Sequence, residues 1–133
     1  MFKSLFQRPS QKTLAQQTGD SAEARALHHL QSQGLRLLVR NYRVAKGPNA
    51  RGGEIDLVMH APDGTLVFVE VRARKMGKHG DAAASITAQK QQHLIYAAQH
   101  YLQRFATLPP CRFDVVAIDG EQLRWLPAAF GAT

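Results

Sequence analysis

The stretch Gly53-Glu54-Ile55-Asp56-Leu57 carries charged residues at alternate positions, and so does the end of Val67-Phe68-Val69-Glu70-Val71-Arg72. A period of two is typical of a β-strand whose two faces have different surroundings. Between the two stretches, Pro62-Asp63-Gly64 has the composition of a three-residue hairpin loop, with Pro at the first turn position and Gly in the left-handed conformation. The two stretches therefore predict an antiparallel β-hairpin.

The loop length fixes which residues of this hairpin face each other. A three-residue loop places Asp56 opposite Glu70. The same register places Glu54 opposite Arg72, and strand alternation puts all four side chains on one face. Opposed residues have Cβ atoms only ~4.5 to 5.5 Å apart, so two carboxylates repel each other unless a cation lies between them. The pair indicates a site for a divalent metal that acts on phosphate.

Length and composition predict a single domain. The chain has 133 residues, 44% of them hydrophobic, which is enough for one core. Residues 1–17 contain three basic residues and no acidic one and are rich in Gln and Ser, a composition typical of a flexible basic tail. We therefore expect one domain over residues 18–133.

Basic residues flank the predicted hairpin on both sides, and the net charge is +7. The first cluster consists of Arg36, Arg40, Arg43, Lys46 and Arg51, and the second of Arg72, Arg74, Lys75 and Lys78. Lys and Arg bind phosphates by displacing counterions, so basic clusters beside a carboxylate pair favour a nucleic-acid partner. The plainer interpretation is a basic surface without a specific ligand.

Cysteine content and hydropathy favour a cytoplasmic protein. Cys111 is the single cysteine, which excludes an intramolecular disulfide and a cysteine-rich zinc site. No apolar run approaches the ~18 residues that a membrane span requires, and residues 1–17 lack the features of a secretory signal. The six histidines are scattered without metal-ligand spacing. We expect a soluble protein in a reducing compartment.

The remaining pattern predicts an α/β fold with the element order αβββαβ and a short additional strand. The expected elements are a helix from an Asp20 or Ser21 cap to Gly34, strands over 35–44, 54–60 and 66–74, a helix over 87–105, and strands over 112–118 and 123–126. The second helix would connect its two flanking strands as a crossover, which makes those strands parallel neighbours. The sequence predicts a mixed sheet flanked by helices.

Glu23 and Lys90 are further candidates for the site. Glu23 shares a helix face with Leu27 and Leu30, so its carboxylate either reaches water at the rim or faces the cleft as a further metal or water ligand. Lys90 lies one turn into the second helix, where it either contacts the same phosphate or is an ordinary exposed lysine.

Several charged residues also have structural interpretations. Glu54 and Arg72 can form an ordinary cross-strand ion pair. Arg74 and Lys75 can neutralise the two carboxylates without metal, which would leave a phosphate-binding surface with no hydrolysis. Asp114 lies in an apolar strand, and pairing with nearby Arg112 on the same face is its simplest explanation.

The order and spacing of these motifs resemble a known family. Gly53-Glu54-Ile55-Asp56-Leu57, Phe68-Val69-Glu70-Val71-Arg72 and Arg112-Phe113-Asp114-Val115-Val116, with Gly19-Asp20 and Glu23 upstream, are similar to the YraN-type family of small bacterial proteins assigned as endonucleases. The resemblance covers residues 18–130. It implies a restriction-endonuclease-like fold related to Holliday-junction resolvases, whose relatives act as dimers on two-fold symmetric substrates.

The resemblance also implies roles for individual residues. Asp56 and Glu70 would be catalytic carboxylates that hold Mg²⁺ or Mn²⁺ together with the carbonyl of Val71, and Glu23 would position the attacking water. Arg72 occupies the position of the signature lysine; it can stabilise charge on phosphate but cannot lose a proton near neutral pH. The implied function is a metal-dependent endonuclease acting on DNA, with branched or structured DNA among its substrates.

Nucleic-acid contacts would come from the basic residues around this site. The predicted contact residues are Arg43, Lys46, Arg51, Arg74, Lys75, Lys78 and Lys90. The alternatives are a catalytically silent nucleic-acid-binding module and, more distantly, an adaptor whose basic loops bind an acidic protein. The sequence shows no decisive dimer seam, so a homodimer rests on the resemblance alone.

Overall fold

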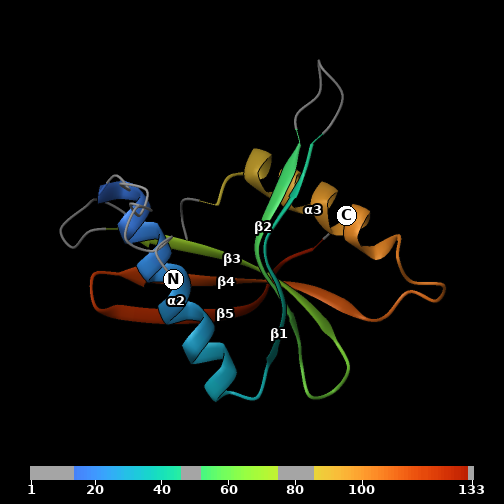
Figure 1. Ribbon diagram of the computed structural model, residues 1–133, viewed down its shortest axis with the longest axis horizontal. Coiled ribbons are helices and arrows are strands. Elements are labelled where there is room, and N and C mark those ends of the chain that lie inside the picture. The colour runs from blue at the N-terminus through green and yellow to red at the C-terminus, as the bar shows by residue number, and fades with distance from the viewer. Residues whose placement is uncertain (1–13, 46–51, 75–85, 132–133) are drawn as a thin grey trace, which may run out of the picture.

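A five-stranded mixed sheet forms the centre of the protein, with one helix packed on each face (Figure 1). The computed structural model describes residues 14–45, 52–74 and 86–131. Its elements are α2 (Leu14–Ser32), β1 (Arg36–Val44), β2 (Gly53–His60), β3 (Leu66–Arg74), α3 (Ala88–Leu102), β4 (Cys111–Asp119) and β5 (Gln122–Phe130). The strand order is β1-β2-β3-β4-β5, so the predicted α/β fold with an αβββαβ core is confirmed.

The predicted register of the central hairpin is confirmed where the two strands pair. β2 and β3 are antiparallel, with Leu57 opposite Val69 and Met59 opposite Val67. In the connecting turn Gly64 has a φ of +94°, a conformation that glycine adopts without steric cost. The Asp63 carboxylate accepts a hydrogen bond of 3.0 Å from the backbone N–H of Thr65. The turn thus selects the register through its own geometry.

The helix α3 connects β3 to β4 as a crossover, and this connection determines the second half of the sheet. β3 and β4 pair in parallel through α3, as the sequence predicted, and β5 returns antiparallel to β4. Thr87 caps α3, since its hydroxyl accepts a hydrogen bond of 3.1 Å from the backbone N–H of Lys90. This cap fixes the start of the helix, and therefore the position of its first turn.

The first helix begins earlier than the sequence predicted. α2 starts at Leu14, so residues 14–17 are helical and the proposed cap at Asp20 or Ser21 lies inside the helix. The segment 14–17 contains Leu, Ala and Gln, which are all good helix formers, and Gly19 is tolerated within the helix. Residues 1–13 of the proposed basic tail lie outside the described residues. The helix ends near Gly34, whose φ of +96° stops it.

Two hydrophobic clusters cover the two faces of the sheet. On one face, Ala22, Ala26 and Leu30 of α2 pack against side chains of β2, β3 and β4. On the opposite face, α3 packs against another set that includes Phe68. Val67 and Val69 belong to the α2 side and Phe68 to the α3 side, so the alternation of β3 matches the two layers. No helix in the described parts of the chain could span a membrane.

Asp114 is a structural residue of β4. Its carboxylate is fully buried and accepts hydrogen bonds from Arg112 Nε at 3.0 Å, Trp125 Nε1 at 2.9 Å and the Ala128 N–H at 2.9 Å. The predicted pairing with Arg112 is therefore confirmed. Ala128 has a φ of +50°, and the β4–β5 register shifts nearby. The carboxylate thus holds an irregular segment of β5, which is longer than the predicted strand 123–126.

Candidate active site

Asp56 lies where the central hairpin separates. The pairing of β2 with β3 ends at Leu57 and Val69, and the two strands diverge beyond that point (Figure 1). The Asp56 carboxylate oxygen Oδ2 accepts a hydrogen bond of 2.8 Å from the backbone N–H of Val71. Beyond the last ladder pair of β2 and β3, the Val71 N–H therefore binds a side-chain oxygen of β2. On the other side Asn41 has a φ of +52°, and no ladder pair joins it to Asp56. The irregular backbone on both sides orients this carboxylate.

Glu70 is a buried carboxylate between two cations. Its residue is only 3% exposed, and its alternation with Val69 and Val71 directs it to the face that α3 covers. The Oε2 oxygen lies 3.4 Å from Lys90 Nζ and 3.7 Å from Arg72 Nη1. A buried charge requires such partners, because an isolated carboxylate in the interior is strongly destabilising.

Glu70 affects the ionisation of Asp56. Burial of Asp56, followed by the negative charge of Glu70 and a hydrogen bond with it, raises the pKa of Asp56 from 3.8 to about 8. The Val71 N–H acts in the opposite direction but is outweighed. A divalent cation beside both oxygens would favour the ionised form of each group. With a pKa of about 8, Asp56 therefore retains its proton near neutral pH.

The predicted opposition of Glu54 and Arg72 is not found. Glu54 pairs instead with Arg43 of β1, with 3.3 Å between Oε1 and Nε, and Arg72 pairs with Glu70 of its own strand. The reason is the divergence of β2 from β3, since a register fixed by the turn extends only as far as the strands stay paired. Arg72 is thereby placed against the carboxylate site.

Lys90 reaches the site because α3 lies very close to β2. A Cβ atom on Gly53 would lie 2.4 Å from the His93 carbonyl oxygen and 2.9 Å from the Ala97 Cβ, so only glycine allows this approach. Thr87 fixes the helix start one turn before Lys90. Lys90 therefore lies beside Glu70 with a side chain that is 43% exposed, and its contact with phosphate stays a prediction.

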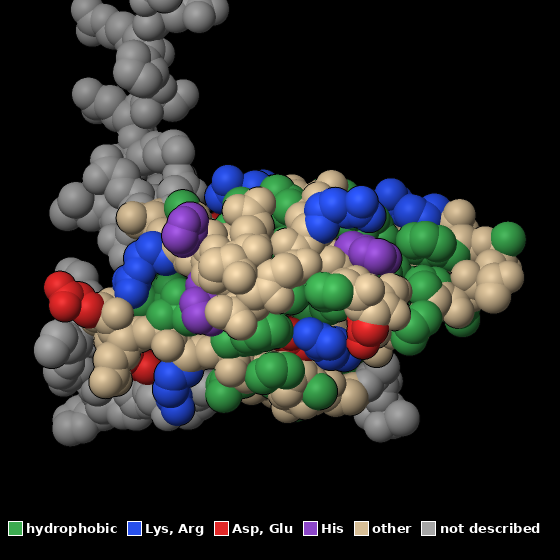
Figure 2. Space-filling model, turned by 90° about the horizontal axis from the view of Figure 1, so that it is seen from below, with side chains coloured by type: hydrophobic (Ala, Val, Ile, Leu, Met, Phe, Trp, Pro, Cys, Tyr) green, Lys and Arg blue, Asp and Glu red, His purple; other side chains and the backbone are tan. Residues whose placement is uncertain are grey.

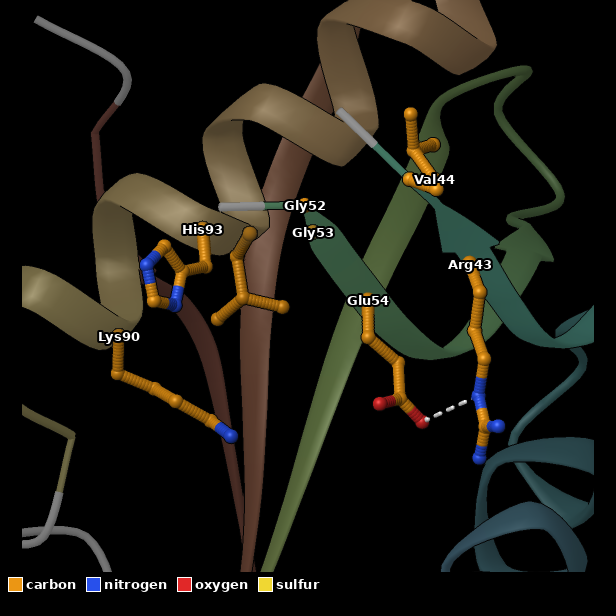
Figure 3. A pocket seen from close by; sticks show the side chains of 9 residues that line it. Arg43, Val44, Gly52, Gly53, Glu54, Lys90 and His93 are labelled. Carbon is orange, nitrogen blue, oxygen red and sulfur yellow. Dashed lines mark ion pairs between the residues drawn. The ribbon is translucent and has the colours of Figure 1, made fainter. Parts of the chain in front are cut away.

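A hollow of about 450 Å³ lies beside Glu54 and Lys90 (Figure 3). Its wall is formed by the end of β1, the start of β2 and the first half of α3, and the lining residues are Arg43, Val44, Ala45, Gly52, Gly53, Glu54, Lys90, His93 and Leu94. Lys90 both lines this hollow and pairs with Glu70. The charge of Glu54 contributes to the raised pKa of Asp56. Lys90 therefore links the hollow to the carboxylate pair.

Glu23 has a different partner from the one expected for a water ligand. Its Oε1 lies 3.6 Å from Arg40 Nη2, and its side chain is 15% exposed. Its helix, α2, covers the face of the sheet opposite to that of Glu70. The role of Glu23 at the site remains a prediction, while the ion pair with Arg40 gives this carboxylate a structural function.

The predicted nucleic-acid contacts divide into two groups. Arg43, Arg74 and Lys90 are described by the structure, and two of them, Arg43 and Lys90, line the hollow. The other four, Lys46, Arg51, Lys75 and Lys78, lie outside the described residues. Figure 2 shows basic side chains recurring across one face of the molecule, with acidic side chains at fewer points. This distribution agrees with the net charge of +7.

The donors at the site suit a hard divalent cation. Within residues 14–45, 52–74 and 86–131 no three His, Cys, Asp or Glu side chains are grouped as a protein-only metal cage. Mg²⁺, however, is normally held by one or two carboxylates, with waters and substrate phosphate oxygens completing its shell. The paired oxygens of Asp56 and Glu70, with the raised pKa of Asp56, fit that pattern.

Residues 22–118 match the family described as "Uncharacterised protein family UPF0102". The chain belongs to this family. The YraN-type assignment drawn from the motifs is thereby confirmed. The chain is 62% identical to a UPF0102 protein of Methylibium petroleiphilum over 115 residues, covering 86% of this chain and 94% of that protein. It is 58% identical to a UPF0102 protein of Albidiferax ferrireducens over 118 residues, covering 89% and 90%.

Proposed function

We propose that this UPF0102 protein is a Mg²⁺- or Mn²⁺-dependent endonuclease that hydrolyses phosphodiester bonds of DNA. The observation that carries the proposal is the adjacent pair of carboxylates at the point where β2 and β3 separate. One of them, Glu70, is almost fully buried, and the pKa of the other, Asp56, is raised to about 8. Strongly perturbed acids beside a hollow are typical of functional sites.

Asp56 and Glu70 are the residues that would hold the ion. When bound, a divalent ion supplies a more acidic water and neutralises part of the phosphate charge. The protein's contribution is to fix the two carboxylates: the Val71 N–H orients Asp56, and Lys90 with Arg72 orients Glu70. These contacts keep both groups in place before substrate arrives.

Arg72 and Lys90 have a second task in this proposal. Both are partly exposed, with 34% and 43% of the side chain accessible, so they can contact a phosphate while they remain beside Glu70. Their positive charges would stabilise the negative charge that increases on the phosphate oxygens in the transition state. Two cations from different elements thus offer what a single signature lysine provides in the related enzymes.

The experiment is a cleavage assay with purified protein and supercoiled, linear duplex, single-stranded and four-way branched DNA. We expect cleavage in Mn²⁺ or Mg²⁺, none in EDTA, and a loss of at least about a hundredfold in Asp56→Ala and Glu70→Ala variants. Asp63→Ala, in the exposed hairpin turn, is the matched control and should retain activity. Cleavage that persists in both site variants would point to a contaminating nuclease and refute the proposal.

A catalytically silent nucleic-acid-binding module is the second candidate. It is favoured by the two ion pairs of Glu70, which already neutralise this carboxylate without metal. This alternative predicts DNA binding that weakens with salt and is unchanged by EDTA or by Glu70→Gln. DNA binding without cleavage of any of the four substrates would support the module over the enzyme.

A further inference from the structure

The hollow beside the carboxylates has the size and chemistry of a nucleotide site. Its volume of about 450 Å³ lies within the ~300–1,000 Å³ typical of small-molecule sites. Figure 3 shows Arg43 and Glu54 on the strand side and Lys90 and His93 on the helix side of this hollow. We propose that it accepts one unpaired nucleotide of the DNA strand, next to the phosphate held at the carboxylates.

The phosphate end of such a nucleotide is indicated by Lys90. This residue lines the hollow and lies 3.4 Å from Glu70, so an anion bound to its ammonium is adjacent to the carboxylate pair. A nucleotide with its phosphate at Lys90 therefore extends from the proposed reaction site into the hollow. This assignment rests on the proposed function for the identity of the site.

The base end is indicated by Glu54 and Arg43. Their ion pair of 3.3 Å is exposed, with 47% and 75% of the two side chains accessible, and an exposed pair contributes little to stability. Its partners can therefore exchange this contact for a ligand at a small energetic cost. A carboxylate accepts hydrogen bonds from an exocyclic amine such as that of cytosine. A guanidinium stacks on a base.

The wall between these ends is shaped by backbone rather than side chains. Gly52 and Gly53 line the hollow, and a Cβ on Gly52 would lie 2.0 Å from the Val44 carbonyl oxygen. The glycines let β2 start directly against β1 and α3, and they add no side-chain atoms to this wall of the hollow. A base enters a site of this kind only after it leaves the helical stack, so the proposed substrate class is DNA with an extruded or unpaired nucleotide.

The test uses 2-aminopurine fluorescence with the full chain in EDTA, so that cleavage does not interfere. The DNA probes are a duplex with one extrahelical 2-aminopurine, the same duplex fully paired, and free 2-aminopurine deoxynucleoside monophosphate. We expect binding to the extrahelical probe about tenfold tighter than to the paired duplex, with a change in the probe's fluorescence. The free nucleotide should bind weakly, because it lacks the contacts of the surrounding strand.

Ala45→Phe is the decisive variant, since Ala45 is exposed at the hollow and a phenyl ring there would fill it. It should remove the preference for the extrahelical probe and retain binding to paired duplex. Ala106→Phe, at an exposed position after α3, is the matched control and should behave as wild type. Equal affinity for the two duplexes, an unaffected preference in Ala45→Phe, or tight binding of the free nucleotide alone would overturn the inference. Cleavage activity in Mn²⁺ decides the proposed function separately.

Discussion

Replacing Asp56 with Asn should make the metal-free protein more stable at alkaline pH. The pKa of Asp56 is raised from 3.8 to about 8, so the folded state binds more protons than the unfolded chain between these values. The stability that this proton binding provides is fully present below about pH 4 and is lost as the pH rises to about 8. Asn carries no charge and retains an oxygen that can accept from the Val71 N–H.

The expected gain in stability of Asp56→Asn follows from the difference between the two pKa values of Asp56. At about 1.36 kcal/mol per pH unit, a rise from 3.8 to about 8 gives a ceiling of about 6 kcal/mol. Asp56 is only half-buried, so solvent screening reduces the expected gain to about 1–3 kcal/mol at pH 8.5. At pH 4 the variant and the wild type should differ little, because this pH lies at the lower end of the range over which the stability of the wild type changes.

The assay is urea denaturation in EDTA at half-unit steps from pH 4 to pH 9. Asp63→Asn is the control, since the Thr65 N–H lowers the pKa of Asp63 and its contribution is lost only as the pH falls below the ordinary value. Asp63→Asn should therefore show no trend between pH 5 and pH 9. A difference between wild type and Asp56→Asn that is constant across the range would refute the reasoning about paired carboxylates.

Three further substitutions test other parts of the structure. Asp114→Ala should lower the free energy of unfolding by about 3–5 kcal/mol, since it leaves buried donors and the Arg112 charge without their acceptor, and urea denaturation measures it. Gly53→Ala should cost about 1–3 kcal/mol, because the new methyl group displaces α3, and a wild-type denaturation midpoint would contradict this close packing. Lys90→Ala should reduce Mn²⁺-dependent cleavage about ten- to a hundredfold while Lys90→Arg retains part of it; equal rates in the two variants would exclude a role for the charge.

The sequence predicted the layers of the fold because those depend on local patterns. The hairpin turn at Pro62-Asp63-Gly64, the alternation of β3 and the amphipathic α3 each act over a few residues, and the structure agrees with all three. The start of α2 was wrong by several residues because capping signals at Asp20 and Ser21 compete with a preceding segment that is itself a good helix former.

The site was predicted less completely, because it lies where regular pairing stops. The hairpin register correctly aligned Leu57 with Val69, but it could not show that the strands separate immediately beyond them. Because the strands separate, Glu54 forms its ion pair with Arg43 of β1, and Arg72 forms its ion pair with Glu70 of its own strand. The place of Lys90 depends on the close approach of α3, for which the only sequence signal was a glycine at the start of β2.

The most direct test of the central claim is calorimetric titration of the metal-free protein with Mn²⁺ at pH 7, in two buffers with different heats of ionisation. The account predicts one ion bound per chain at the pair formed by Asp56 and Glu70, with release of up to about one proton, because binding favours ionisation of Asp56. Glu70→Gln and Asp56→Asn should each weaken binding strongly, and Asp56→Asn should abolish the proton release. Binding that is absent in the wild type, or unchanged in both variants, would contradict the claim that these two carboxylates hold one cation.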